Sequence, residues 1–267
     1  MTGGIDADRS VFGMIHLQAL PGAPGFDGDR EAIRDAMLRD ARRLEAAGVD
    51  GLMIENFGDA PFYAEDVPKH VVASMTSYVS DLRRETDLPI GVNVLRNDAE
   101  AALSIAAAAE ASLVRINVHT SARLTDQGVV TGNAPETIRL RDRLEADVSI
   151  LADVDVKHSA PLAERPLPEE VAELVERGHA DGVVASGAGT GHETDRDHLE
   201  AVVDARDDLD RDVPVFVGSG VRRDTVAETL DVADGVIVGT DLKESGETTA
   251  PVDEDRAREL VAAARAD

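Results

Sequence analysis

Short apolar runs alternate with amphipathic helical patterns along the whole chain. The runs predict eight strands, at 11–17, 51–57, 89–95, 113–118, 149–154, 182–186, 213–220 and 235–240. Between them apolar residues recur at helical spacing. Ile33, Met37 and Leu44 mark one face of the first helix, which is expected to stop at Gly48. A last helix is expected at about 253–265, because it opens with acidic residues and ends with arginine, as the helix dipole favours.

Strands that alternate with helices predict a parallel α/β fold, and eight of them predict a single closed (β/α)8 barrel of the TIM type spanning residues 1–267. Three helices lead into the next strand through an Asp-Gly turn, in GVDGLMI, HADGVVA and VADGVIV, which indicates repeated units. A doubly wound open sheet is the alternative, but no GxGxxG follows the first strand. One long connection, 119–134, is of a length that is usually functional or mobile.

Strand parity predicts a ring of polar side chains inside this barrel. Alternate residues of a barrel strand face the helices, so the apolar positions of each strand turn the residues between them inward. The expected ring is His16, Glu55, Asn93, Arg115, Asn117, Asp153 and Ser186. The same parity, carried past the fifth strand, turns Asp155 and Lys157 inward. Barrel active sites lie at this end of the strands, although a structural hydrogen-bond network is the alternative for any one residue.

The seventh and eighth strands end in turns that suit an anion. These turns contain Gly218, Ser219, Gly220, Gly239 and Thr240. Glycine lets backbone N–H groups approach an anion, and barrels often bind phosphate at these two loops. A helix starting near 222–225 would add its dipole, whereas close strand–helix packing is the alternative reason for the glycines. The loop 186–195, with Thr190, is either a lid or a plain connection.

Charge and composition narrow the class of protein. The net charge is −26, and a basic face for nucleic acid is not visible. A hydrophobic content of 43% argues against a disordered acidic chain. We therefore expect adaptation to high salt, where charges are screened within roughly 3 Å at about 1 M. Without cysteine, a signal-like start or a long apolar stretch, the sequence predicts a cytoplasmic protein that binds neither nucleic acid nor membrane.

The chain has three lysines, Lys69, Lys157 and Lys243, against 24 arginines. Lys157 and His158 directly follow the fifth strand, and Lys243 follows the eighth, whereas Lys69 lies further along its loop and is expected to be structural. Pairing with phosphate or substrate charge is favoured for the other two over a Schiff base or a structural ion pair. No metal motif is specific, and no cofactor is expected beyond inorganic phosphate as a co-substrate.

Several long segments resemble the BtpA family of barrel proteins. They are ENFGDAPF (55–62, which includes Asn56), GVNVLRNDA (91–99), RINVHTSARLTDQGVVTGNA (115–134), LADVDVKHSAPL (151–162), VASGAGTGHETD (184–195), VGSGV (217–221) and DGVIVGTDLK (234–243). One departure is Asp155, where the family is expected to favour His. The resemblance implies a (β/α)8 barrel and, for halophilic-looking members, similarity to barrel-type nucleoside phosphorylases acting on purine nucleosides such as guanosine.

Phosphorolysis of a nucleoside needs an anion site, partners for the ribose and a proton donor for the leaving base. The glycine turns with Lys243 are candidates for phosphate, and Glu55, Asp153 and Lys157 are the catalytic candidates. The candidates for binding the nucleoside are His16, Asn56, Asn93, Arg115, Asn117, His158, Ser186 and Thr190. Two alternatives stay open: another sugar-phosphate enzyme, such as an aldolase or isomerase, and a non-enzymatic photosystem-assembly factor. Barrel relatives often self-associate, so a homo-oligomer is expected.

Overall fold

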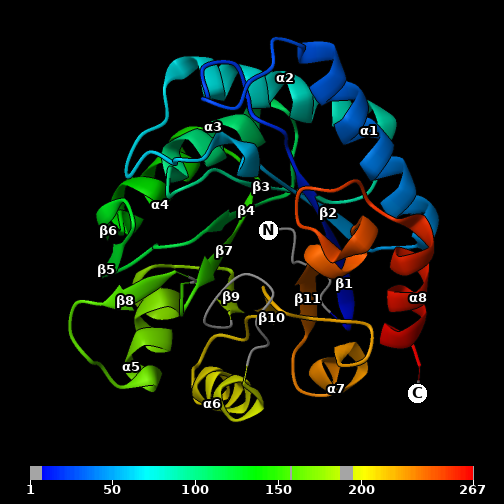
Figure 1. Ribbon diagram of the computed structural model, residues 1–267. Coiled ribbons are helices and arrows are strands. Elements are labelled where there is room, and N and C mark those ends of the chain that lie inside the picture. Colours follow the sequence, from blue (N-terminus) through cyan, green and yellow to red (C-terminus); the bar gives the residue numbers. More distant parts are fainter. Residues whose placement is uncertain (1–7, 157, 187–194, 267) are drawn as a thin grey trace.

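Parallel strands close into a barrel in the computed structural model, which describes residues 8–156, 158–186 and 195–266. Within these residues eight strands pair in the order β1-β11-β10-β9-β7-β4-β3-β2 (Figure 1). They are β1 (Ser10–His16), β2 (Gly51–Glu55), β3 (Ile90–Asn93), β4 (Leu113–Ile116), β7 (Ser149–Asp153), β9 (Gly182–Ala185), β10 (Val215–Val217) and β11 (Gly235–Val238). The predicted (β/α)8 barrel is confirmed, and each predicted strand contains one of the observed strands or overlaps it.

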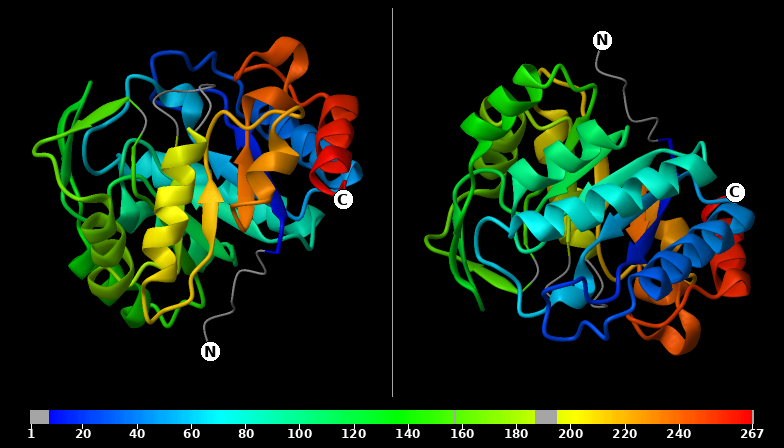
Figure 2. Two further views of the ribbon diagram at one scale, coloured as in Figure 1. Left: turned by 90° about the horizontal axis from the view of Figure 1, so that it is seen from below. Right: turned by 90° about the horizontal axis from the view of Figure 1, so that it is seen from above.

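Helices cover the outside of the barrel (Figures 1 and 2). They are α1 (Arg30–Ala47), α2 (Lys69–Glu85), α3 (Ala99–Ala108), α4 (Ala134–Arg143), α5 (Leu167–Ala172), α6 (Arg196–Asp207), α7 (Val226–Leu230) and α8 (Glu254–Ala264). The side chain of Asp29 caps the start of α1 by accepting from the backbone of Ala32, and Gly48 ends it with a φ of 88°. Across the described ranges, no helix has the length and apolar character needed to cross a bilayer.

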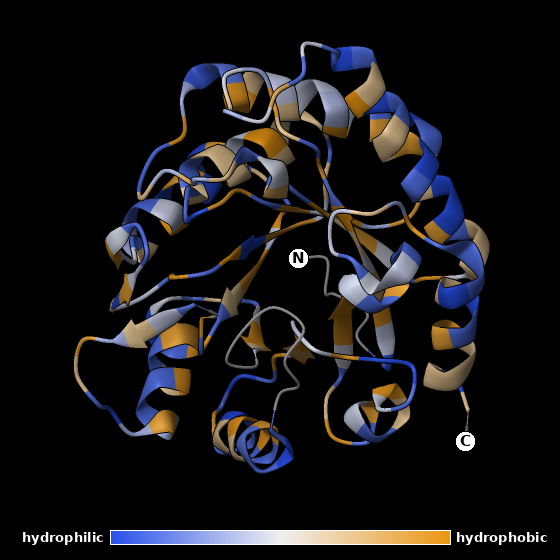
Figure 3. Cartoon of the chain, viewed as in Figure 1, coloured by the Kyte–Doolittle hydropathy of each residue, from blue (hydrophilic) through white to orange (hydrophobic). Residues whose placement is uncertain are grey.

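Alternate strand residues contribute to two apolar cores, one inside the barrel and one between the strands and the helices. Inside the barrel lies a small cluster of inward-facing residues, namely Phe12, Met14, Met53, Leu113, Leu151, Val184, Phe216 and Ile237. The alternate strand residues, such as Ile15, Ile54 and Val114, join the larger core between strands and helices, and the apolar colouring of the strands in Figure 3 reflects this double burial. The predicted facing of the strand residues is therefore confirmed within the strands themselves.

The repeated Asp-Gly turns have a physical reason at the base of the barrel. Asp50 accepts a hydrogen bond from the backbone N–H of Val11 at 2.9 Å. Asp181 does the same for Ile150 near the start of β7 at 3.0 Å, and Asp234 for Val215 at the start of β10 at 2.7 Å. Each aspartate also forms an ion pair with arginine. The carboxylates thus satisfy backbone donors where each adjacent strand starts.

The long connection 119–134 forms a β-hairpin beside the barrel. Its strands β5 (Ala122–Thr125) and β6 (Gly128–Thr131) join β8 (Ser159–Pro161) in a small antiparallel sheet at the left of Figure 1. Val118, Val130 and Val156 pack into a separate apolar cluster of their own. Strand parity, extended past β4 and β7, would turn Val118 and Val156 toward the barrel helices; it fails for both, because both lie beyond the ends of their barrel strands.

Lys243 is buried outside the barrel rather than in its mouth. Its side chain is only 1% exposed, and its Nζ lies 3.2 Å from Oδ2 of Asp40 on α1. The other oxygen of Asp40 accepts from the backbone N–H of Val252 at 3.1 Å. Burial lowers the pKa of Lys243, and the carboxylate of Asp40 opposes that shift. The ion pair therefore ties α1 to the segment that follows β11.

Replacing Lys243 by Met should cost stability, because it leaves Asp40 buried without its counter-charge. Breaking one side of a buried pair costs about 3–5 kcal/mol. Denaturant unfolding at one fixed salt concentration measures the loss. Lys69→Met is the matched control, since Lys69 is exposed at the start of α2; equal unfolding midpoints for the two variants would contradict the structural role of Lys243.

Candidate functional site

A polar layer closes the carboxyl end of the barrel above its apolar core. The strand register pairs His16 with Glu55, Glu55 with Asn93, and Asn93 with Arg115, so four neighbouring strands present these side chains at one level. One step earlier, Met14 pairs with Met53, and apolar residues fill the barrel. The layer marks the point where the barrel interior changes from hydrocarbon to polar groups.

A bidentate ion pair organises this layer. Nε and one terminal nitrogen of Arg115 each donate to a different oxygen of Asp153 at 2.8 Å. Asn117 adds a second donor to Asp153 at 3.2 Å, and Ser186 accepts from Arg115 at 3.3 Å. Arg115 and Asp153 are almost fully buried. Because donors occupy both carboxylate oxygens, Asp153 fixes the guanidinium, a role better suited to it than acid–base catalysis.

Asn93 has a buried side-chain oxygen that accepts no hydrogen bond within the described residues. Its amide nitrogen donates to the carbonyl of Arg115 at 2.8 Å and lies 3.4 Å from the side-chain oxygen of Asn117. Among the described residues nothing hydrogen-bonds its buried Oδ1. An acceptor left without a donor in a buried polar layer is a suitable contact for a ligand hydroxyl or N–H group.

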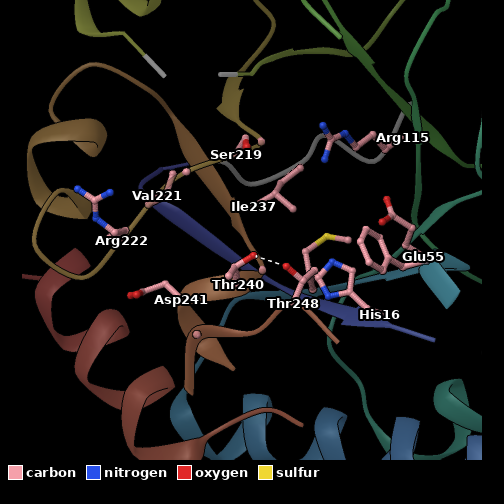
Figure 4. A pocket seen from close by; sticks show the side chains of 16 residues that line it. His16, Glu55, Arg115, Ser219, Val221, Arg222, Ile237, Thr240, Asp241 and Thr248 are labelled. Atoms are coloured by element: carbon pink, nitrogen blue, oxygen red, sulfur yellow. Dashed lines mark hydrogen bonds between the residues drawn. The ribbon is translucent and has the colours of Figure 1, made fainter. Parts of the chain in front are cut away.

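A pocket at the barrel mouth joins the polar layer to the glycine turns (Figure 4). The predicted residues that line it are His16, Glu55, Arg115, Gly218, Ser219, Gly220, Gly239 and Thr240. Sequence reasoning missed Met14, Phe57, Val221, Arg222, Ile237, Asp241, Gly246 and Thr248, which complete the lining. Met14 and Ile237 could have been found from strand parity, whereas Thr248 lies in a loop without periodicity.

The two glycine turns require glycine because other groups lie close. A Cβ atom on Gly218 would lie 2.8 Å from a guanidinium nitrogen of Arg115. On Gly239 it would lie 2.9 Å from Cε1 of His16. Both distances are shorter than ordinary carbon contacts, so a side chain at either position would displace the polar layer. The turns and the layer are thus fitted to each other across the pocket.

The turn after β11 carries hydroxyl groups toward the pocket. The side chains of Thr240 and Thr248 are hydrogen-bonded at 2.9 Å (Figure 4). Asp241 is held by Arg256 at 3.0 Å and by the backbone N–H of Arg223 at 3.0 Å. The helix expected to start near 222–225 is α7, which starts at Val226 with Thr225 at its N-cap and has only five residues, so its dipole is short. The hydrogen-bond donors at this end of the pocket are therefore turn backbone N–H groups, hydroxyls and the guanidinium of Arg222.

Other predicted residues are placed elsewhere. Asn56 braces the loop after β2: its amide nitrogen donates to Asp59 at 3.0 Å, and its oxygen accepts from the backbone of Leu95 at 2.8 Å. His158 is exposed, and Lys243 is in the buried pair with Asp40. Lys157 and Thr190 lie outside the described residues. Asn56 and Lys243 have structural partners, so we leave both out of the site.

Arg96 is a further buried cation that sequence reasoning missed. It is 9% exposed, and burial lowers its pKa while the carboxylates of Asp153 and Glu55 oppose the shift. These interactions place Arg96 beside the polar layer. No strand parity pointed to it, because it follows the end of β3 in the segment GVNVLRNDA.

Asp155 turns away from the barrel axis, contrary to the parity expectation. β7 ends at Asp153, and the chain after it no longer alternates like a strand. Asp155 pairs with His198 of α6 at 3.0 Å and with Arg123 of β5 at 3.2 Å. The close contact with His198 lowers the pKa of Asp155, and the same contact raises the pKa of His198. Burial raises the pKa of Glu170, and the nearby charge of Asp155 raises it further.

His198 should therefore titrate above the usual histidine value of about 6.5. Because the pKa of His198 is higher in the folded state, protonated His198 stabilises the fold. This contribution is complete below about pH 6.5 and is lost as the pH rises through the folded-state pKa. Ionised Asp155 likewise stabilises the fold above about pH 3.9, and this stabilisation is lost as the pH falls through its folded-state pKa. An NMR titration of His198 tests this: Asp155→Asn should lower its pKa, and the exposed control Asp87→Asn should not. An unchanged His198 titration in Asp155→Asn would contradict the pairing.

No group of three or more histidine, aspartate or glutamate side chains in the described parts of the chain is arranged to hold a metal ion. The site therefore offers hydrogen-bond donors, two carboxylates, buried guanidinium groups and an imidazole. Such groups can bind an oxyanion and handle a proton at a second ligand.

The fold and this pocket define the chain as a (β/α)8 barrel protein with a polar pocket at the carboxyl ends of its strands. The model of the BtpA family matches residues 7–266, and the chain belongs to that family. A Synechocystis relative named Photosystem I biogenesis protein BtpA is 42% identical over 243 residues, 91% of this chain and 83% of that protein. An uncharacterized protein of Thermococcus kodakarensis is 43% identical, covering 96% of this chain and 95% of that protein.

Solved structures of similar fold are TIM-barrel enzymes. Tryptophan synthase of Mycobacterium tuberculosis gives a TM-score of 0.60 at 18% identity, covering 98% of this chain and 95% of that chain. Phosphoribosyl anthranilate isomerase of Thermus thermophilus gives 0.58 at 12%, covering 95% and 97%. Thiamine phosphate pyrophosphorylase of Pyrococcus furiosus gives 0.58 at 15%, covering 97% and 96%. At these identities the likeness shows the fold alone.

Proposed function

We propose that this protein is a nucleoside phosphorylase that cleaves a purine nucleoside, guanosine in particular, with inorganic phosphate to give free base and ribose 1-phosphate. The observation that carries the proposal is the single pocket in which the glycine turns after β10 and β11 face Glu55 and His16. The purine preference comes from the family resemblance. With a net charge of −26, we place the enzyme in a salt-rich cytoplasm.

Phosphate is assigned to the side of the pocket formed by the two turns. Backbone N–H groups at Gly220 and Gly239, with the hydroxyls of Ser219 and Thr240, are suitable donors to an oxyanion. Arg222 lies at the same side (Figure 4), at the outer edge of the pocket, where its Nε pairs with Asp224 at 3.3 Å. Many of the enzymes built on this fold bind phosphate at these loops, which supports the assignment.

The nucleoside is assigned to the opposite side, where the polar layer meets an apolar wall. Met14, Phe57 and Ile237 line this part of the pocket and suit the faces of the sugar and base. A phosphate oxygen attacks C1′ of the ribose, and the C1′–N9 bond breaks. The bonding electron pair leaves with the purine, which takes up a proton. The guanidinium of Arg115, held in place by Asp153, is the positive group that we assign to the side of the reacting phosphate.

Glu55 is the carboxyl group that we assign to the departing base. It lies at the end of β2 in the pocket wall, next to His16 in the strand register. Asp153 was an equal candidate by sequence, but the donors from Arg115 and Asn117 already occupy its oxygens. A carboxyl group at Glu55 can accept from the base N–H groups or, when protonated, donate to the leaving ring.

A Schiff-base aldolase finds less support in the described residues. Lys243 is buried against Asp40, and Lys69 starts α2, so neither lines the pocket. Only Lys157, outside the described residues, would remain for such chemistry. A non-enzymatic role, as in the name of the Synechocystis relative, predicts that partner binding survives the replacement of Glu55 and Asn93.

The direct test incubates the protein with guanosine and phosphate in multimolar salt and measures guanine and ribose 1-phosphate. We expect base release that depends on phosphate. Glu55→Gln should lower kcat by about 100-fold or more, the usual range for losing a general acid. Glu31→Gln, an exposed change on α1, is the matched control and should leave the rate intact. Absence of phosphate-dependent release from a whole panel of nucleosides would sink the proposal.

The phosphate side has its own test in Gly239→Ala. The added Cβ would lie 2.9 Å from Cε1 of His16, so it crowds the space between the turn and the polar layer. We expect the KM for phosphate to rise about tenfold, which corresponds to ~1.4 kcal/mol. Gly25→Ala, on an exposed loop, is the matched control. A KM that is unchanged in Gly239→Ala would move the phosphate site away from this turn.

A further inference from the structure

The turn that follows β2 is hydrogen-bonded to both neighbouring loops at the mouth of the barrel. We call residues 56–59 the braced turn; its last three residues form a short 3-10 helix. The backbone N–H of Gly58 donates to the carbonyl of Leu17, just beyond the end of β1, at 2.9 Å. The backbone of the braced turn is therefore joined to the loop after β1.

Two buried polar side chains add further links. Asp59 accepts from the backbone N–H of Leu20 at 2.7 Å and from the amide nitrogen of Asn56 at 3.0 Å. The side-chain oxygen of Asn56 accepts from the backbone N–H of Leu95, after β3, at 2.8 Å. Asn56 and Asp59 are both buried. The braced turn is thus fixed between the loops after β1 and β3.

This arrangement has an energetic cost. A carboxylate taken out of water is destabilising unless hydrogen bonds compensate it. Burial raises the pKa of Asp59, and the hydrogen bonds from Leu20 and Asn56 oppose that shift. Within the braced turn, Phe57 is the residue that lines the pocket. The buried polar groups therefore determine where the ring of Phe57 lies.

The ring of Phe57 is a rare kind of surface in this protein. Aromatic residues make up 3% of the chain, and Phe12 and Phe216 lie in the apolar core of the barrel. Phe57 is only partly buried. Its ring centroid lies 5.0 Å from that of His16, at an interplanar angle of 61°, and 6.5 Å from that of Phe62. A fixed and partly exposed phenyl ring in a pocket wall is suited to pack against a flat ring of a ligand.

We propose that Phe57 is a specificity-determining residue that stacks against the heterocycle of the ligand, and that Asn56 and Asp59 are the positioning residues that hold its ring in place. This assignment rests on the proposed function, because it takes the ligand to carry a nucleobase. A two-ring base offers more area to a phenyl face than a one-ring base, so the stack favours purine over pyrimidine. Because the ring is held before the ligand arrives, little side-chain entropy is lost on binding.

Equilibrium binding without phosphate tests the stack, because no turnover then occurs. The probes are guanosine, uridine and ribose 1-phosphate, measured by calorimetry in multimolar salt. Phe57→Leu keeps an apolar side chain and removes the aromatic face, so the Kd of guanosine should rise about tenfold, within the range for losing a base–aromatic stack. Uridine should lose less, and ribose 1-phosphate, which has no base, should bind as before. Phe26→Leu, packed against the core outside the pocket, is the matched control.

The positioning role has its own variant, Asp59→Asn. The new amide can present only one oxygen to the two donors that now face the carboxylate, so the brace weakens. Affinity for guanosine should fall while affinity for ribose 1-phosphate is retained. A purely structural role would lower the unfolding midpoint without separating the two ligands. Asp87→Asn, an exposed change, is the matched control.

NMR of the protein with labelled phenylalanine rings covers the case in which Phe57→Leu fails to fold, which circular dichroism would reveal. Phe57→Tyr identifies the Phe57 signal, which guanosine should shift and ribose 1-phosphate should not.

The outcomes separate this proposal from the proposed reaction. An unchanged guanosine affinity in Phe57→Leu, an equal loss for guanosine and ribose 1-phosphate, or a Phe57 signal that guanosine leaves in place overturns the stack, even where phosphorolysis is observed. Guanosine binding with the expected effects, but without phosphate-dependent base release, overturns the reaction alone. A wild type that binds no nucleoside overturns both.

Discussion

The buried ion pair between Arg115 and Asp153 is the interaction on which the mouth of the barrel depends. A guanidinium inside a barrel is strongly destabilising unless a counter-charge and further hydrogen bonds compensate it. Asp153 supplies the charge from the neighbouring strand, and Asn117 and Ser186 complete the contacts. The pair therefore fixes where the polar layer lies above the apolar core. It also places a positive group against the turn at Gly218.

Around this pair, the two sides of the pocket carry different chemical groups. Strands β1 and β2 present an imidazole and a carboxyl group in register. Strands β10 and β11 end in turns with glycine and hydroxyl groups that approach the layer closely. In the proposed function, the first side handles a proton and the second holds an oxyanion. A displacement reaction in which an oxyanion attacks and a base departs uses both functions in one pocket.

The fold and much of the site could be predicted from the sequence because strand parity is a strict physical rule. Apolar residues at alternate positions of each strand predict the inward side chains from His16 to Ser186. The rule failed where its premise failed: Asp155 lies beyond the end of β7, and its direction is set by His198 and Arg123. Lys243 was misplaced because its partner Asp40 is 203 residues away, and composition cannot reveal such a contact.

The central claim is that one pocket holds an oxyanion between the turns after β10 and β11, opposite Glu55. A crystal structure of the protein grown with phosphate tests it most directly. The account predicts phosphate density between the Gly218–Gly220 turn and Thr240, within hydrogen-bonding distance of Ser219. Phosphate bound in another part of the barrel mouth, with this turn empty, would contradict it.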